Sequence, residues 1–252
     1  MNSITSDEIS ESLSQLGLPQ RAKVLVHSSL SSFGYVEGGA DAVIDAILNT
    51  VGPDGTVLVP TLTATALHSP ENPPIFDPVN TPCWTGRIPE TFRNRPEAIR
   101  SLHPTHSVAV IGAHAEELTK DHTYSISPCD EKSPFGKLSE YEDGYVLLLG
   151  AGYGSITSFH HAEELAGVDY HMQKGFTNAT LVIDGEEITR HYMLHQWGTP
   201  RDFNILESLF IERCVQRKTQ IGNSDVRLLS ASGIATTTIA CLRSDSRILC
   251  KD

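Results

Sequence analysis

Residues 145–169, YVLLLGAGYGSITSFHHAEELAGVD, decide the fold that this sequence predicts. The stretch begins with an apolar run, residues 145–149, which has the length and bulk of a buried strand. Gly150, Gly152 and Gly154 follow, and glycine permits both a sharp turn and the close approach of a ligand. Residues 159–166 then favour a helix, which the preceding hydroxyl residues can cap. The stretch therefore predicts a strand, a glycine turn and a helix in succession.

The start of this predicted helix carries residues suited to proton transfer. His160 lies three residues before Glu163 and four before Glu164, so each pair shares one helical face. An imidazole oriented by a carboxylate can take up a proton near neutral pH. His161 is expected to point elsewhere, because adjacent helical positions diverge by ~100°. Taken without further context, His160 is better explained as a capping or core histidine.

Composition indicates an ordinary soluble globular protein. The chain has 252 residues, of which 39% are hydrophobic, and it lacks the ~20 consecutive apolar residues of a membrane-spanning helix. Its first residues are acidic and amphipathic, which does not fit a signal peptide. Five scattered cysteines without a CxxC motif indicate reduced thiols and a cytoplasmic protein, with neither disulfides nor a zinc site. We expect a single α/β domain over residues 1–252.

The net charge restricts the classes of ligand. A formal charge of -12 argues against nucleic acid, whose phosphates would be repelled. The same charge is compatible with a small cationic substrate. When charge is the sole observation, it is better explained as acidity that keeps the protein soluble.

The remaining patterns alternate between strands and helices before the predicted elbow. Strands are predicted at residues 22–26, 56–60 and 108–111, and helices at 5–16, from 39, at 85–93 and at 113–120. Residues 61–82 carry several prolines and little periodicity, which is typical of a long irregular binding segment. Beyond the elbow, we expect a hairpin about Asp184-Gly185, a helix over 202–215, a strand over 224–229 and a helix over 233–242. This order predicts an α/β fold with an antiparallel portion toward the C-terminus.

The loop after the first predicted strand is rich in hydroxyl groups. Residues 27–34, HSSLSSFG, present backbone N–H groups that suit phosphate or another anion. The loop matches neither the Walker A nor the GxGxxG pattern. Taken alone, it is better explained as an ordinary capped connection than as a ligand site.

Several ordered segments resemble one known family. They are VHSSLSSFG (26–34), FDPVNTPCWTGRIPETFR (76–93), RSLHPTHSVAVIG (100–112), SPFGKL (133–138), LLLGAGYGSITSFHHAEE (147–164) and the tail IGNSDVRLLSASGIATTTIACLR (221–243). In order and spacing these segments resemble the antibiotic N-acetyltransferases, the family of the aminoglycoside 3-N-acetyltransferases. The resemblance covers roughly residues 15–245.

The resemblance implies a fold, a reaction and catalytic residues. The implied fold is a mixed-sheet α/β sandwich, distinct from the GNAT acetyltransferases. The implied reaction is direct transfer of acetyl from acetyl-CoA to an amino group of an aminoglycoside, at the 3-N position. His160 stands at the position of the general base and Glu163 at the glutamate that fixes its tautomer. Thr157, Ser158 or a backbone N–H would stabilise the oxyanion.

The resemblance also implies where the acyl donor binds. The CoA pyrophosphate is expected on the first loop, with two further residues lining the same cleft and Arg100 contacting an anionic part of the cofactor. The expected cofactor-binding residues are His27, Ser28, Ser29, Leu30, Ser31, His103 and Ser107. His27 and His103 are equally explained as hydrogen-bonded loop residues. No metal is expected.

The substrate segment departs from the pattern of the aminoglycoside-modifying members. Residues 61–68 are small and weakly polar, and the carboxylates that would hold a polycationic sugar are not obvious there. Candidates elsewhere in the chain are Glu37, Asp169 and Asp202. An acyltransferase for another small amine therefore stays open, as do a binding protein without turnover and a metal-dependent hydrolase using His160 and Glu163. The expected partners are acetyl-CoA and a small amine, without nucleic acid or membrane; a homodimer is left open.

Overall fold

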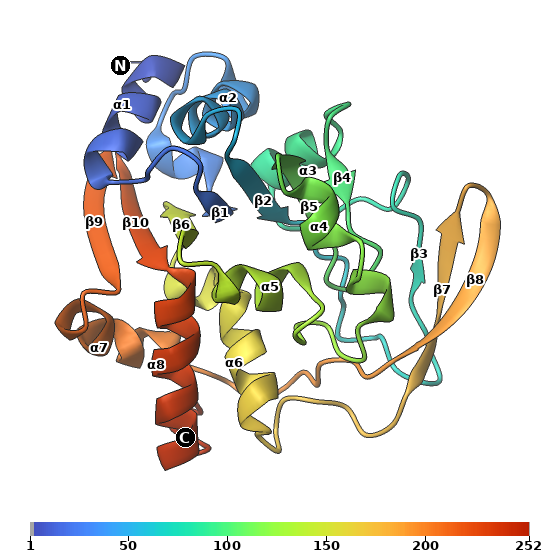
Figure 1. The fold of residues 1–252 in the computed structure, drawn as a ribbon. Coiled ribbons are helices and arrows are strands. Elements are labelled where there is room, and N and C mark those ends of the chain that lie inside the picture. The colour runs from blue at the N-terminus through green and yellow to red at the C-terminus, as the bar shows by residue number, and fades with distance from the viewer. Residues whose placement is uncertain (1–2, 252) are drawn as a thin grey trace.

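A seven-stranded mixed sheet forms the centre of the computed structural model, which describes residues 3–251 (Figure 1). Its strands are β1 (Lys23–Ser28), β2 (Thr56–Pro60), β4 (Ile99–Arg100), β5 (Val108–Gly112), β6 (Gly144–Leu149), β9 (Gln216–Ile221) and β10 (Ser224–Ser230). Their order is β4-β5-β2-β1-β6-β10-β9. The central β1 pairs parallel to β2 and β6, and the outer pairs are antiparallel. The mixed sheet and its antiparallel C-terminal side confirm the predicted fold class.

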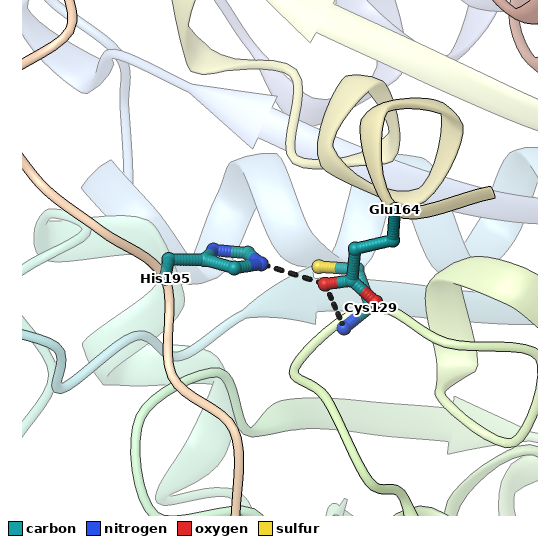
Figure 2. A group of neighbouring side chains, drawn as sticks. All are labelled: Cys129, Glu164 and His195. Atoms are coloured by element: carbon teal, nitrogen blue, oxygen red, sulfur yellow. Dashed lines mark hydrogen bonds and ion pairs between the residues drawn. The ribbon is translucent and has the colours of Figure 1, made fainter. Parts of the chain in front are cut away.

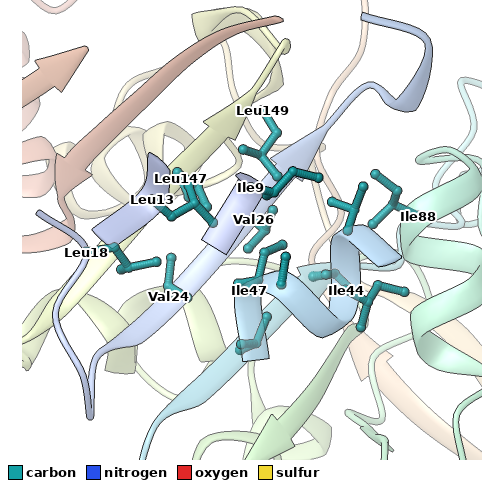
Figure 3. Close-up of a cluster of buried hydrophobic side chains, with 14 of the residues drawn as sticks. Ile9, Leu13, Leu18, Val24, Val26, Ile44, Ile47, Ile88, Leu147 and Leu149 are labelled. Carbon is teal, nitrogen blue, oxygen red and sulfur yellow. The ribbon is translucent and has the colours of Figure 1, made fainter. Parts of the chain in front are cut away.

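Side chains of the central strands alternate between two apolar layers. On β1, Val24 and Val26 pack into one hydrophobic cluster and Leu25 into the other. On β6, Leu147 and Leu149 join the first cluster while Leu148 joins the second. Because both faces are buried, these strands have continuous apolar sequences. Figure 3 shows part of the first cluster.

Helices cover both faces of the sheet. The first cluster includes residues of α1 (Ser6–Leu16), α2 (Gly39–Val51) and α3 (Arg87–Arg93). The second includes residues of α4 (Ala115–Thr119), α5 (Pro134–Glu140), α6 (Ser158–Ala166), α7 (Glu207–Glu212) and α8 (Ala231–Ser244). Figure 1 shows α1 and α2 on one side and α5, α6 and α8 on the other. None of the helices within residues 3–251 has both the length and the apolar character needed to cross a bilayer.

The cap of α1 forms as its sequence predicts. The Thr5 hydroxyl accepts a hydrogen bond from the Glu8 N–H, and the Glu8 carboxylate accepts one from the Thr5 N–H. Gly17 ends the helix with a φ of 93°, a conformation that favours glycine. This reciprocal capping box explains why α1 begins at Ser6.

A second, three-stranded sheet contains the predicted hairpin. It is formed by β3 (Ile75–Phe76), β7 (Thr177–Ile183) and β8 (Glu186–Tyr192), and the hairpin extends away from the helices (Figure 1). Asp184 and Gly185 both have positive φ, as the tight turn between two antiparallel strands requires. The chain returns from β8 through residues 193–202 toward α6, and this return brings new side chains to the elbow.

Other predicted elements need correction. The helix expected over residues 202–215 consists of a 3₁₀ turn, η4 (Phe203–Leu206), followed by α7. Strands β3, β4 and β9 did not appear in the sequence prediction. The sequence of β9, QRKTQI, is polar because this edge strand exposes most of its side chains.

Candidate active site

The elbow after β6 depends on a glycine. Gly150 has a φ of 66°, and a Cβ there would collide with the Ser32 side chain and lie 2.7 Å from Ser224 Oγ. Its N–H donates to the Asp225 carbonyl at 2.8 Å. The chain then makes the 3₁₀ turn η3 (Tyr153–Ser155) and enters α6. The predicted succession of strand, glycine turn and helix is therefore confirmed.

The elbow opens onto a cavity of about 380 Å³, here called the first chamber. Its walls come from the end of β1, the segment before α3, the elbow and the return segment after β8. The residues that line it are Val26, His27, Ser28, Pro60, Leu62, Trp84, Thr85, Pro89, Gly154, Ser155, Thr157, His160 and Trp197. The cleft thus joins the first serine-rich loop to the elbow histidine.

A second chamber of about 200 Å³ adjoins the first and shares Leu62, Trp84, His160 and Trp197 with it. Its lining residues are Leu62, Ala64, Trp84, His106, His160, His171, His195, Gln196, Trp197, Gly198, Thr199 and Arg201. His160 borders both chambers, and a quarter of its side chain is exposed. One imidazole can therefore contact ligands in either chamber.

The hydrogen bond between His160 and Glu163 fixes the imidazole tautomer. His160 Nδ1 lies 2.8 Å from Glu163 Oε2, across one turn of α6. Because the carboxylate only accepts, Nδ1 carries the hydrogen and donates it. Nε2 of neutral His160 then keeps its lone pair, as a general base requires.

Glu163 is held as an anion although it is completely buried. Burial alone would raise its pKa, but the hydrogen bond from His160 and the nearby charges of His160 and Arg201 lower the pKa to about 2. Arg201 Nε donates to Glu163 Oε1 at 2.7 Å. The carboxylate therefore has an imidazole on one oxygen and a guanidinium on the other.

His171 completes this group as a neutral acceptor. Arg201 Nη2 donates to His171 Nδ1 at 2.7 Å, so that nitrogen holds a lone pair and Nε2 carries the hydrogen. Burial and the charge of His160 lower the pKa of His171 to about 3. The 3.3 Å approach of His171 Nδ1 to Glu163 Oε2 is thus a contact between two acceptors.

The next carboxylate on α6, Glu164, has different partners (Figure 2). Its oxygens lie 2.5 Å from Ser127 Oγ and 2.9 Å from the Cys129 amide nitrogen, which donates. His195 Nε2 lies 2.6 Å from Glu164 Oε1. Burial raises the pKa of Glu164 to about 8 and holds the pKa of His195 well below its usual value. At neutral pH this pair carries no net charge.

Buried imidazoles extend from the site into the interior. Neighbouring rings run from His160 through His195 and His106 to His103 and His122, with centroids between 4.5 and 6.2 Å apart. Burial lowers the pKa of each of the last four. These four imidazoles therefore stay neutral at pH 7.

Comparison with known proteins identifies the family. Residues 25–243 match the model described as aminoglycoside 3-N-acetyltransferase. The chain belongs to the aminoglycoside 3-N-acetyltransferase family.

Relatives and solved structures agree with this family. The chain is 35% identical over 206 residues to the SPbeta prophage-derived aminoglycoside N(3')-acetyltransferase-like protein YokD of Bacillus subtilis (strain 168), covering 75% of this chain and 74% of that protein. It is 30% identical over 243 residues to aminoglycoside N(3)-acetyltransferase IV of Salmonella sp, covering 96% and 88%. The crystal structure of aminoglycoside acetyltransferase AAC(3)-Xa superposes with a TM-score of 0.84 at 30% identity, covering 96% and 94%. The AAC-IIIb binary structure with CoASH gives 0.82 at 28%, covering 96% and 97%.

Within this acetyltransferase fold, the expected cofactor residues separate into two groups. His27 and Ser28 line the first chamber, and Ser29, Leu30 and Ser31 continue from them around the 3₁₀ turn η1 (Leu30–Phe33) without lining it. His103 and Ser107 are completely buried and line neither chamber. Their expected place in the cleft is therefore wrong. The Ser107 hydroxyl instead donates to the Thr61 carbonyl at 2.8 Å.

Arg100 also has a structural role in place of the expected cofactor contact. Its Nη1 donates to the carbonyls of Pro78 and Thr81 at 3.0 and 2.6 Å, and its Nη2 to the Thr61 carbonyl at 3.1 Å. These bonds hold the irregular segment 61–82 against the sheet. The guanidinium is occupied by the protein itself.

The carboxylates chosen as substrate ligands lie outside both chambers. Glu37 precedes α2, and its side chain is exposed there. Asp169 lies 3.4 Å from Arg247, and Asp202 caps η4 through the Asn204 N–H. The prediction of these residues rests on their negative charge alone, and no neighbouring sequence motif links them to the elbow.

The structure adds site residues that sequence reasoning did not find. All of them lie outside the helices and strands of the fold; they are Trp84, Trp197, His171, His195 and Arg201. Trp84 falls within a segment quoted for the resemblance, and that was the one available signal. For the others, no periodicity or motif linked them to the elbow.

Two groups have donor atoms close enough to hold a metal ion. They are His160 with Glu163 and His171, and Cys129 with Glu164 and His195, each with donor atoms within 4.8 Å of one another. In both groups the carboxylate already accepts hydrogen bonds from protein donors. Burial raises the pKa of the Cys129 thiol well above its usual value, which disfavours the thiolate that would bind a metal or act as a nucleophile.

Proposed function

We propose that the chain is an acetyl-CoA-dependent N-acetyltransferase in which His160 is the general base. The thioester would occupy the first chamber, and the amine would approach through the second. The observation that carries this proposal is the position of His160 between the chambers, with Nδ1 bound to Glu163 and Nε2 free to accept a proton. CoASH in the AAC-IIIb structure supports acetyl-CoA as the donor.

The proton balance follows from the same geometry. A primary ammonium has a pKa near ~10, so the amine must lose a proton before or during its attack. The ammonium gives up this first proton to solvent, and His160 Nε2 then takes a second N–H proton as the nitrogen of the neutral amine bonds to the acetyl carbon. The resulting imidazolium lies against ionised Glu163, which stabilises its charge. When the C–S bond breaks, the imidazolium returns the proton to the CoA thiolate and neutral His160 is restored.

Thr157 is our candidate for oxyanion stabilisation. It is buried at the start of α6, lines the first chamber and makes no side-chain capping bond to the helix. Its hydroxyl is therefore available to donate to the developing oxyanion of the thioester carbonyl. Ser28 Oγ, on the opposite loop, is buried without a partner among the described residues and offers a second donor to the same chamber.

The names of the relatives make an aminoglycoside amino group, at the 3-N position, the first acceptor to test. Another small amine is the second candidate. One observation favours it: neither chamber is lined by a carboxylate that could hold a polycationic sugar.

His160→Ala tests the proposal. Thiol release from acetyl-CoA should fall by ~10²–10⁴-fold with any accepted amine, while acetyl-CoA still quenches or shifts the tryptophan fluorescence. His191→Ala, on the exposed face of the hairpin, is the matched control and should retain the parent rate. Turnover unchanged by His160→Ala would refute the general base. Loss of turnover on adding a chelator would instead support the metal-dependent alternative.

A further inference from the structure

The walls of the site carry no acidic side chain that faces an acceptor. The two chambers continue into a small hollow beside Ala64, His106 and His195, and none of the residues lining these three spaces, as far as the described chain extends, is aspartate or glutamate. This composition is unexpected for a protein whose net charge is -12. The negative charge of the chain therefore lies elsewhere on its surface.

The two carboxylates nearest the site are both neutralised by protein groups. Glu163 is completely buried and bonded to Arg201 and His160. Glu164 is bonded to Ser127, to the Cys129 N–H and to His195. Both side chains are buried and line neither chamber, so neither can receive a substrate ammonium there. A second or third ammonium on an acceptor would lose its water without gaining an opposite charge, which is unfavourable.

Aromatic surface takes the place of acidic surface. Trp84 and Trp197 are the only tryptophans in the sequence, and both line both chambers. They are 56% and 50% exposed, although indole rings usually bury most of their surface. Trp84 Nε1 donates to the Ala64 carbonyl at 2.9 Å, so the ring is fixed before any ligand arrives. Exposed indole faces bind flat apolar faces of rings, and they attract a single cation through the π system.

We propose that the acceptor has one protonatable amine on an otherwise uncharged, ring-containing body that packs against Trp84 and Trp197. This inference rests on the proposed acetyl transfer and names the substrate class of the same site. Monoamino sugars and arylalkylamines share the required chemistry.

The experiment compares three acceptors at equal concentration: the methyl glycoside of glucosamine, 2-phenylethylamine and the polyamine gentamicin. Thiol release from acetyl-CoA gives kcat/KM, and calorimetry on the protein with CoA bound gives acceptor affinity without turnover. We expect at least one monoamine to exceed gentamicin tenfold in both measurements. The monoamine KM should also stay within twofold between 50 and 500 mM salt, because the amine meets no fixed charge.

The outcomes separate this inference from the proposed function. Acetyl-CoA binding with preference for gentamicin, or with binding of neither acceptor class, overturns the inference and leaves the donor site standing. Absence of acetyl-CoA binding and of any thiol release overturns the proposed function, and this inference with it. The fluorescence of the only two tryptophans follows donor binding directly, since both line the first chamber.

Gln196→Glu provides a gain-of-charge test. Gln196 lines the second chamber and is exposed, and glutamate has nearly the same shape. The variant should raise gentamicin kcat/KM relative to the monoamine by about fivefold or more, with a gentamicin KM that increases with salt. Gln20→Glu, which adds the same charge on a distant turn, should leave the ratio unchanged. An unchanged ratio in Gln196→Glu would contradict the view that missing carboxylates exclude polyamines.

Discussion

Glu163 and Glu164 are adjacent on α6, both are buried and both contact a histidine, yet their pKa values move in opposite directions. The pKa of Glu163 falls to about 2, whereas that of Glu164 rises to about 8. The difference lies in their other partners. Arg201 brings a permanent positive charge to Glu163, while Glu164 meets only Ser127, a backbone N–H and a neutral imidazole.

This comparison shows how one helix can hold an ion and an uncharged acid side by side. At Glu163 the hydrogen bond from His160 and the charges of His160 and Arg201 outweigh burial, whereas at Glu164 the hydrogen bonds from Ser127 and the Cys129 N–H do not. The ionised residue is bonded to the proposed base, and the uncharged one anchors the return segment at His195. Four experiments can break or sharpen the contrast.

Glu163→Gln should have the largest effect. The amide cannot offset the charge of an imidazolium, so we expect kcat to fall by ~10²–10⁴-fold. Steady-state thiol release measures this change. Glu164→Gln is the matched control on the adjacent position. Equal losses in the two variants would show that both carboxylates serve the same purpose.

On acidification, the free energy of unfolding should begin to fall at an unusually high pH. His122 and His171 have folded pKa values of about 4 and 3, below ~6.5 in the unfolded chain, so the folded state binds fewer protons in that window. The contribution of these histidines to stability is complete above pH ~6.5, and each removes up to ~1.4 kcal/mol per pH unit below it. Glu163 adds to the loss only below pH ~4.5. Urea unfolding at pH 7.5, 6.5, 5.5 and 4.5 measures the slope; a flat profile to pH 4.5 would contradict the neutral state of these imidazoles.

Arg201→Gln should have an intermediate effect. Without the guanidinium, the pKa of Glu163 rises because burial is no longer offset by that charge. We expect kcat to fall about tenfold at pH 7, in line with the loss of one buried charge-assisted hydrogen bond, which is worth ~1.5–3 kcal/mol. The acid limb of the kcat profile should move to higher pH. Arg201→Lys should return the acid limb part of the way to its parent position. If the kcat profile does not move in Arg201→Gln, Arg201 does not help to keep Glu163 ionised.

Glu164→Gln should have the smallest effect on activity, within ~3-fold of the parent, because an amide replaces an acid that is already uncharged. The variant should differ from the parent in its free energy of unfolding at mildly alkaline pH. The folded pKa of Glu164 is raised, so the folded state binds more protons than the unfolded one and parent stability falls as pH rises toward 8. The variant should lack this fall between pH 6.5 and 8. A parallel fall in parent and variant would show that Glu164 is ionised.

The sequence predicts the central sheet because its strands are apolar on both faces. The runs at β1, β2, β5 and β6 lie within one or two residues of their predicted positions, and the capping box of α1 forms as expected. The elbow is equally predictable, since Gly150 is required by its backbone conformation and by contact with Ser32. His160 and Glu163 are linked by helical spacing alone. Local sequence rules are enough to predict a contact when its partners are close in sequence.

The partners that come from distant irregular segments could not be predicted. Arg201 reaches Glu163 across 38 residues, and His195 reaches Glu164 across 31. No periodicity marks these segments, whose path is set by the hairpin that precedes them. The same limitation applies to His103, Ser107 and Arg100, whose place near the cofactor was implied by the resemblance. Ser107 and Arg100 instead donate to the Thr61 carbonyl, on the loop after the neighbouring strand, and His103 accepts from the Thr105 and His106 amides.

The position of His160 as a shared wall has a kinetic consequence. Donor and acceptor would each have a compartment of their own, so neither has to leave before the other enters. A ternary complex, and not a double-displacement cycle through an acylated side chain, is the reaction order that this partition favours.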